Sequence, residues 1–183
     1  MISGIAVGLA LAAAPTSGQA QEVLQTPTQA LKEIFPEAAR TAAETRVLTP
    51  ASVRSLALQL GRPVSDEPRE ITRVWDAAGK LAGYAVVTEE IGKYRPITFM
   101  VGVTPALAIR DVAVLVYRES RGGDIKRKRF LSQYRGKTVR NPIDSNRDII
   151  NISGATISVR SMNSGVKRVL AELNVLIGPP VQK

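Results

Sequence analysis

The pattern of apolar and polar positions predicts two short helices in the first third of the chain. Apolar residues recur at helical spacing over residues 28–35, directly before Pro36. A second helical pattern covers residues 51–60 and ends at Gly61, and a proline-containing loop follows it. Residues 21–27 precede the first helix and are expected to form an extended linker.

The pattern changes in the middle of the chain to one typical of β-strands. Four runs rich in β-branched and aromatic residues are separated by short connections, at residues 71–75, 81–88, 97–103 and 109–117. Strands in such close succession form an antiparallel meander, so the predicted fold class is α+β, a single domain whose helices pack on one side of the sheet. Trp75, Tyr84 and Tyr94 are interpreted as core or sheet-surface residues.

The last third of the chain combines an amphipathic helix with a run of small residues. The apolar face of this helix comprises Val159, Met162, Val166, Val169 or Leu170, and Leu173. Ser153-Gly154-Ala155-Thr156 directly precedes it, and a backbone with such small side chains allows another molecule to approach closely. The N–H groups of a first helical turn favour phosphate, so the site suits a phosphate ester on Thr156. The same residues also fit a tight turn in which Thr156 or Ser158 caps the helix.

Composition restricts the chemistry that this chain can perform by itself. The 183 residues include no His and no Cys. Their absence excludes Ser-His-Asp and Cys-His catalysis, thiolate metal sites, iron–sulfur ligation and c-type haem attachment. A protein of this composition that handles electrons needs an organic cofactor.

The four small residues and Ile157-Ser158 carry a resemblance to a known family. They resemble the flavinylation motif of the FMN-binding domain, which occurs in one subunit of the sodium-pumping NADH:quinone oxidoreductase and in one subunit of the Rnf complex. Upstream segments follow the family's order: Gly92-Lys93, Pro96-Ile97, Val101-Gly102-Val103, Ile109 to Tyr117, Glu119-Ser120-Arg121-Gly122-Gly123, Phe130, Gln133, Gly136 and Lys137. The resemblance covers roughly residues 80–173, within a domain that we expect to span residues 28–178.

The resemblance implies that Thr156 carries FMN through a phosphodiester bond. A separate flavin transferase that uses FAD and a divalent metal would install this bond. The expected cofactor site further comprises Ser153, Gly154, Ala155, Ser158, Glu119, Ser120, Arg121, Gly122 and Lys137. Among these, Lys137 is expected to contact the phosphate or the ring edge. The family usually has Asp three residues before the motif Ser, whereas this chain has Ile150 there and Asp148 two residues further upstream.

The N-terminus predicts export. Residues 5–14 are small or apolar, and Gly18-Gln19-Ala20 resembles a signal-peptide cleavage site, so residues 1–20 are interpreted as a signal peptide cleaved after Ala20. No Lys or Arg precedes the apolar run, and a disordered Ala-rich tail is the alternative. The run is shorter than the roughly 20 residues that a transmembrane helix needs. We therefore expect a periplasmic or otherwise exported protein without a transmembrane span in the mature chain.

The net charge of +9 favours acidic partners or anionic surfaces. Nucleic acid is not expected as a partner, because aromatic residues make up only 4% of the chain and no recognisable binding motif occurs. The cluster Lys126-Arg127-Lys128-Arg129 is either a solvated surface or a docking patch for an acidic redox partner or lipid headgroups.

These observations predict an electron carrier that acts with an acidic redox protein or a membrane redox complex. Turnover of a substrate by the domain itself is not required for that role. Two alternatives stay open, a module that binds FMN or another phosphate-bearing ligand non-covalently, and a basic periplasmic scaffold for anionic polymer.

Overall fold

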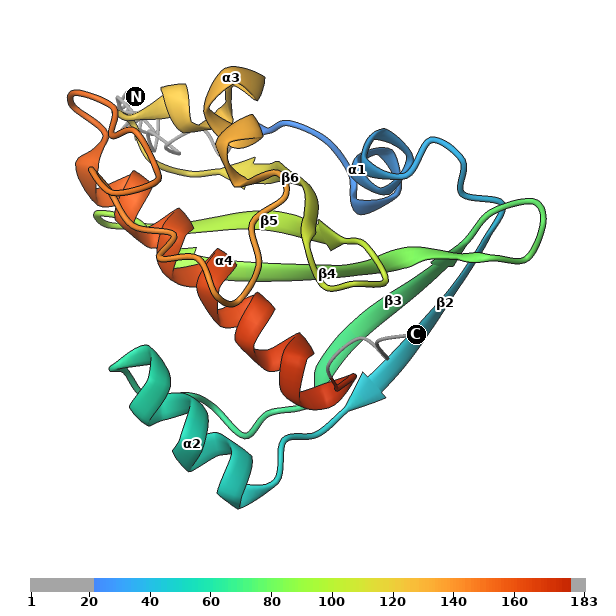
Figure 1. The fold of residues 1–183 in the computed structure, drawn as a ribbon. Coiled ribbons are helices and arrows are strands. Elements are labelled where there is room, and N and C mark those ends of the chain that lie inside the picture. Colours follow the sequence, from blue (N-terminus) through green and yellow to red (C-terminus); the bar gives the residue numbers. More distant parts are fainter. Residues whose placement is uncertain (1–21, 179–183) are drawn as a thin grey trace, which may run out of the picture.

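The computed structural model describes residues 22–178, which form a six-stranded antiparallel sheet with helices on it (Figure 1). The strand order is β1-β6-β5-β4-β3-β2. The strands are β1 Glu22–Val23, β2 Arg40–Arg46, β3 Arg69–Trp75, β4 Leu81–Ile91, β5 Pro96–Val103 and β6 Ile109–Tyr117. The helices are α1 Pro27–Ile34, α2 Pro50–Leu60, α3 Lys128–Leu131 and α4 Thr156–Leu176, with 3-10 turns at Gly123–Lys126 and Ser132–Tyr134.

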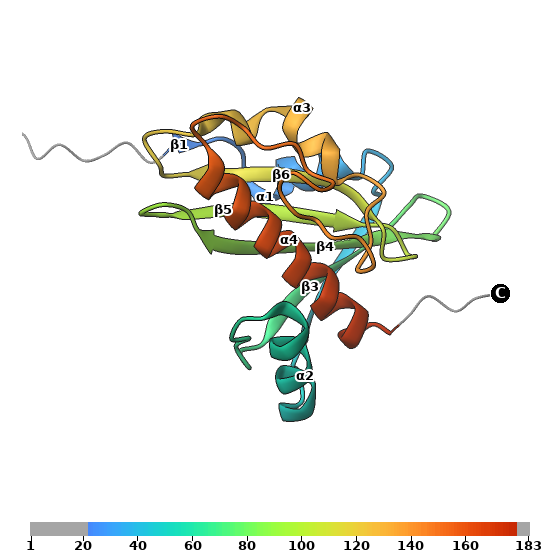
Figure 2. The same cartoon turned by 60° about the vertical axis from the view of Figure 1, so that its left-hand side comes forward.

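Each face of the sheet carries its own hydrophobic core. Alternate residues of β5, such as Phe99 and Val101, join the main core with Met162 and Val166 of α4. Met100 faces the opposite side, where a smaller cluster includes Ile34 and Phe35 from α1 and the residue after it. Figure 2 shows α4 crossing one face of the sheet while α1 lies behind the other.

The predicted α+β meander is therefore confirmed, with one correction to the arrangement of its helices. α1 packs on the face opposite α4, so helices cover both faces rather than one. Two strands had no sequence signal. β2 is largely polar and exposed and forms the edge beside β3, while β1 lies within the expected linker and pairs with Tyr117 and Val116 of β6. The predicted signal peptide falls outside the described residues.

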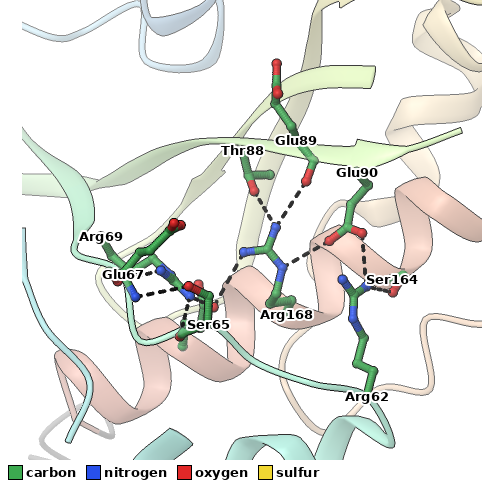
Figure 3. A network of polar contacts seen from close by, with 10 residues as sticks. Arg62, Ser65, Glu67, Arg69, Thr88, Glu89, Glu90, Ser164 and Arg168 are labelled. Carbon is green, nitrogen blue, oxygen red and sulfur yellow. Dashed lines mark hydrogen bonds and ion pairs between the residues drawn. The ribbon is translucent and has the colours of Figure 1, made fainter. Parts of the chain in front are cut away.

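Charged side chains fix α4 to the sheet in addition to its apolar face. Figure 3 shows the Arg168 guanidinium of α4 reaching β4, where it bonds the Glu90 carboxylate at 3.0 Å and the Thr88 hydroxyl at 2.6 Å. Arg62 donates to the other oxygen of Glu90 at 3.0 Å, and Arg69 bonds Glu172 of α4 at 3.0 Å. Because these carboxylates are buried, the network specifies where α4 lies along β4.

A glycine lets α4 approach the sheet closely at this point. A Cβ added to Gly165 would lie 2.6 Å from Glu90 Cγ and 2.6 Å from Phe99 Cζ, closer than real contacts allow. The position of α4 matters for function because the helix begins at Thr156. Among residues 22–178, no helix has the length and apolar character required to cross a bilayer.

Candidate functional site

Thr156 is the first residue of α4, and its hydroxyl does not cap the helix. Ala155 occupies the cap position, and within residues 22–178 no side-chain cap hydrogen bond is formed there. The Thr156 hydroxyl oxygen instead accepts a hydrogen bond from the Asn151 side-chain amide at 3.2 Å. The helix start therefore keeps its anion-binding capacity, and the Thr156 hydroxyl is held without being used by the backbone.

Three segments far apart in sequence meet around this hydroxyl. A cavity of about 480 Å³ is lined by Lys93, Tyr94, Glu119, Ser120, Arg121, Gly154, Ala155, Thr156, Ile157 and Ser158. Its size lies in the range of small-molecule sites. Figure 2 shows the tip of the β4–β5 hairpin, the loop after β6 and the start of α4 at the same end of the molecule. The structure thus brings together most of the predicted site residues.

Gly122 allows the loop after β6 to lie against the start of α4. Its φ is +80°, and an added Cβ would lie 3.2 Å from both Ala155 Cβ and Ser158 Oγ. The Tyr117 hydroxyl donates to the Arg121 carbonyl at 2.5 Å and lies 3.4 Å from Ser158 Oγ. A phenol is protonated at neutral pH and can donate, and burial raises the pKa of Tyr117 further. Gly122 therefore brings the loop after β6 into contact with the start of α4.

Glu119 holds the hairpin that forms the other wall of the cavity. One of its carboxylate oxygens accepts hydrogen bonds from the backbone N–H of Tyr94 at 2.6 Å and of Arg95 at 2.9 Å. A Cβ on Gly92 would lie 2.7 Å from this same oxygen, so glycine makes room for the carboxylate. Glu119 therefore shapes the cavity by fixing the turn between β4 and β5.

The electrostatic character of the cavity favours an anion. Lys93 and Arg121 line the cavity and are exposed. Neither forms an ion pair with a described residue. Glu119 is the acidic residue of the lining, and its bonds to two backbone N–H groups offset part of its charge. Together with the uncapped start of α4, this arrangement suits a phosphate group beside Thr156.

Comparison with known proteins agrees with the motif. The family model described as the FMN-binding domain matches residues 92–171, which include every residue lining the cavity. This part of the chain is therefore similar to the FMN-binding domain, as the resemblance of the motif predicted. No curated protein matches the chain significantly.

Two solved structures share the fold of this chain. NqrC from Shewanella oneidensis is 17% identical, with a TM-score of 0.53 over 74% of this chain and 80% of that chain. A subunit of the Na(+)-translocating NADH-quinone reductase from Parabacteroides distasonis is 13% identical, with a TM-score of 0.53 over 86% of each chain. At these identities the likeness establishes the fold alone.

Three predicted site residues, Gly122, Ser153 and Lys137, do not line the cavity, and Gly122 instead lies against Ala155 and Ser158. Ser153 is exposed next to the cavity. The Lys137 ammonium pairs with the Asp148 carboxylate at 2.9 Å, and its backbone carbonyl accepts from Ile109 N–H at 2.7 Å. Lys137 therefore stabilises the loop that precedes the motif, and the expectation that it contacts the phosphate or the ring edge has no support in this geometry.

Four residues were missed as contributors to the site, namely Lys93, Tyr94, Asn151 and Ile157. Tyr94 was interpreted as a core or sheet-surface residue, but its side chain is 74% exposed at the hairpin tip and lines the cavity. Nothing in the local sequence indicates which way a hairpin tip points. For Asn151, its place five residues before Thr156 was the available signal, because Asn side chains commonly bond nearby polar groups.

The stabilisation that the Asp148 carboxylate gives to the loop before the motif depends on pH. Burial raises the pKa of Asp148, but hydrogen bonds from the backbone N–H of Asp144 and Ile143 and from Lys137 outweigh it and hold the pKa below the ordinary 3.8. The stabilisation from Asp148 is fully present above the unfolded-state pKa and is lost as the pH falls through the lower folded-state pKa.

We expect Asp148→Asn to cost about 2 kcal/mol near pH 6 and clearly less near pH 3, as measured by urea unfolding. Asp144→Asn, an exposed carboxylate in the same loop, should change little; a constant difference for Asp148→Asn at both pH values would contradict the assignment.

The basic cluster at residues 126–129 is largely neutralised within the fold. Lys126 pairs with Glu22, Arg127 with Asp124 at 2.7 Å, and Lys128 with Glu33 at 2.6 Å. Of the four residues, Arg129 forms no ion pair with a described residue. The cluster therefore presents much less free charge than its sequence indicates.

Proposed function

We propose that this protein carries FMN covalently on Thr156 and transfers electrons between protein partners. The observation that carries the proposal is the Thr156 hydroxyl, which is held by Asn151 beside an uncapped helix start in a cavity lined by two exposed cations. The family match supplies the identity of the ligand. One of the two similar structures is part of a Na(+)-translocating NADH-quinone reductase, which supports an electron-transfer role.

The residues of the cavity fit the phosphate end of such a cofactor. Gly154 and Ala155 leave the backbone accessible, and the first-turn N–H groups of α4 can donate to phosphate oxygens. Lys93 and Arg121 offset the negative charge of the phosphate. Tyr94 presents an exposed aromatic ring at the rim, against which a planar group can pack. The flavin itself supplies reversible one- and two-electron chemistry.

In this proposal a second protein catalyses the attachment, because the Glu119 carboxylate of the lining is held by two backbone N–H groups of the hairpin. In the proposed reaction, a flavin transferase with a bound divalent metal presents FAD to Thr156. The Thr156 oxygen forms a bond to the phosphorus on the flavin side of the pyrophosphate, the bond between the two phosphates breaks, and AMP leaves. The hydroxyl proton passes to a base of the transferase or to water. Thr156 contributes position rather than reactivity to this step.

The test is co-expression with a flavin transferase followed by intact-mass measurement and in-gel fluorescence after denaturation. The proposal predicts a mass increase equal to FMN minus water and fluorescence that survives the gel. Flavin that co-purifies but is released on denaturation would instead support the non-covalent binding module. If no flavin is bound when an active transferase is present, both the covalent carrier and the non-covalent binding module are contradicted.

We also propose that the protein is exported, with residues 1–20 as its signal peptide. The apolar run and the small residues at positions 18 and 20 support this proposal. N-terminal sequencing of protein from the periplasmic fraction should begin at Gln21. Protein that retains Met1 and stays in the cytoplasm would contradict both the export and the exported redox partner.

A further inference from the structure

Free positive charge gathers at the cavity of Thr156 rather than at the basic cluster of the sequence. Lys93 at the hairpin tip and Arg121 after β6 line the cavity, and Arg160 lies one turn beyond Thr156 on α4. All three are exposed and form no ion pair with a described residue. In contrast, the ammonium groups of Lys126 and Lys128 are paired with glutamates.

Exposed apolar side chains lie in the same region as these cations. Ile91 is 64% exposed, Tyr94 74% and Ile157 45%. Tyr94 and Ile157 line the same cavity, and the Ser161 hydroxyl of α4 donates to the Ile91 carbonyl at 2.6 Å, which holds the three side chains in one region. An isolated exposed apolar residue is ordinary, but several beside a ligand cavity indicate a contact surface.

We propose that this hairpin–helix surface, formed by Ile91, Lys93, Tyr94, Arg121, Ile157 and Arg160, docks an acidic redox protein. The proposal rests on the function proposed above and names the partner of that same site. Protein–protein interfaces usually combine exposed apolar side chains with charged and polar groups, as this surface does. The three cations provide charge complementarity to an acidic partner, and complementary charge accelerates encounter.

The position of the surface gives docking a direct consequence. Because Thr156, Tyr94 and Ile157 line one cavity, a partner seated on the hairpin–helix surface lies against the group that Thr156 carries. Charge at the cavity would then guide the partner to the point where electrons are exchanged. A patch elsewhere on the molecule would attract the partner without orienting it.

The experiment measures electron transfer from a reduced plant-type ferredoxin, an acidic iron–sulfur protein, to the flavinylated full chain by stopped flow. The triple variant Lys93→Gln, Arg121→Gln, Arg160→Gln is compared with Arg54→Gln, Lys80→Gln, Arg140→Gln, which removes the same charge at exposed positions of other segments. At low salt we expect the first variant to lower the bimolecular rate constant about tenfold or more and the control no more than about threefold. Added salt should abolish the difference.

Several outcomes would overturn the proposal. If the two triple variants lowered the bimolecular rate constant equally, the net charge of the protein, and not the hairpin–helix surface, would determine the rate. Loss of binding to vesicles of anionic phospholipid in the first variant, with its ferredoxin rate unchanged, would assign the surface to a membrane instead. Intact mass and direct reduction by dithionite check the cofactor separately, so a failed flavin attachment is distinguished from a failed docking surface.

Discussion

Thr156→Ala is expected to abolish covalent flavin completely while the fold remains intact. The substitution removes the one oxygen proposed to bear the phosphoester. It costs a single hydrogen bond to Asn151 on a half-buried side chain, about 1 kcal/mol or less of stability. Co-expression with a flavin transferase, intact-mass measurement and a thermal unfolding curve check both parts of the expectation.

Two further variants at the motif sharpen this result. Thr156→Ser keeps the hydroxyl and should retain some modification. Ser153→Ala should weaken modification less than Thr156→Ala does, because the Ser153 side chain is exposed and lies outside the cavity lining. Flavin that survives denaturation in Thr156→Ala would show that another residue is the acceptor.

The same assay examines how the acceptor hydroxyl is held. Asn151 donates to the Thr156 oxygen and, through its own side-chain carbonyl, accepts from Ile152 N–H at 3.0 Å. Asn151→Ala should therefore slow modification without preventing it, since the acceptor remains but its orientation is less restricted. Modification at the unchanged rate would mean that the transferase alone positions the hydroxyl.

Arg168→Met is expected to be the most destabilising single substitution among the charged residues of α4. It removes the guanidinium that bonds Glu90, Thr88 and the Glu89 carbonyl, and it leaves the carboxylate of Glu90 with Arg62 as its remaining ion-pair partner. Breaking one side of a buried ion pair typically costs about 3 to 5 kcal/mol, because the partner's charge stays buried. Urea unfolding of the protein without flavin measures the loss directly.

Lys167→Met is the matched control for this substitution. Lys167 is the preceding residue of α4, is exposed, and forms no ion pair with a described residue. Its substitution should change stability by less than about 0.5 kcal/mol. Similar losses in the two variants would show that the network around Arg168 contributes no more than a solvated charge.

The sequence determined much of this protein by itself. The four runs that predicted strands are found within β3 to β6, because β-branched and aromatic residues pack well on a pleated sheet. The helical spacing of Val159, Met162 and Val166 predicted α4, whose buried face these residues form. The motif ending at Thr156 predicted a resemblance to the FMN-binding domain, and the family match over residues 92–171 confirms this resemblance.

Other features were decided only by the tertiary structure, because they depend on which segments lie side by side. β2 is polar and exposed, and its pairing with β3 rather than its own composition makes it a strand. α1 buries its apolar side chains on the second face of the sheet, which periodicity cannot specify.

The tertiary structure also decides which basic side chains form ion pairs and which remain unpaired near the site. Lys126 and Lys128 look free in the sequence but pair with Glu22 and Glu33, which lie far away along the chain. Lys93 and Arg121 look unremarkable in the sequence but meet beside Thr156 because the β4–β5 hairpin and the loop after β6 end at the start of α4. The sequence by itself determined the elements and the candidate acceptor residue, whereas long-range packing decided which charges remain free around it.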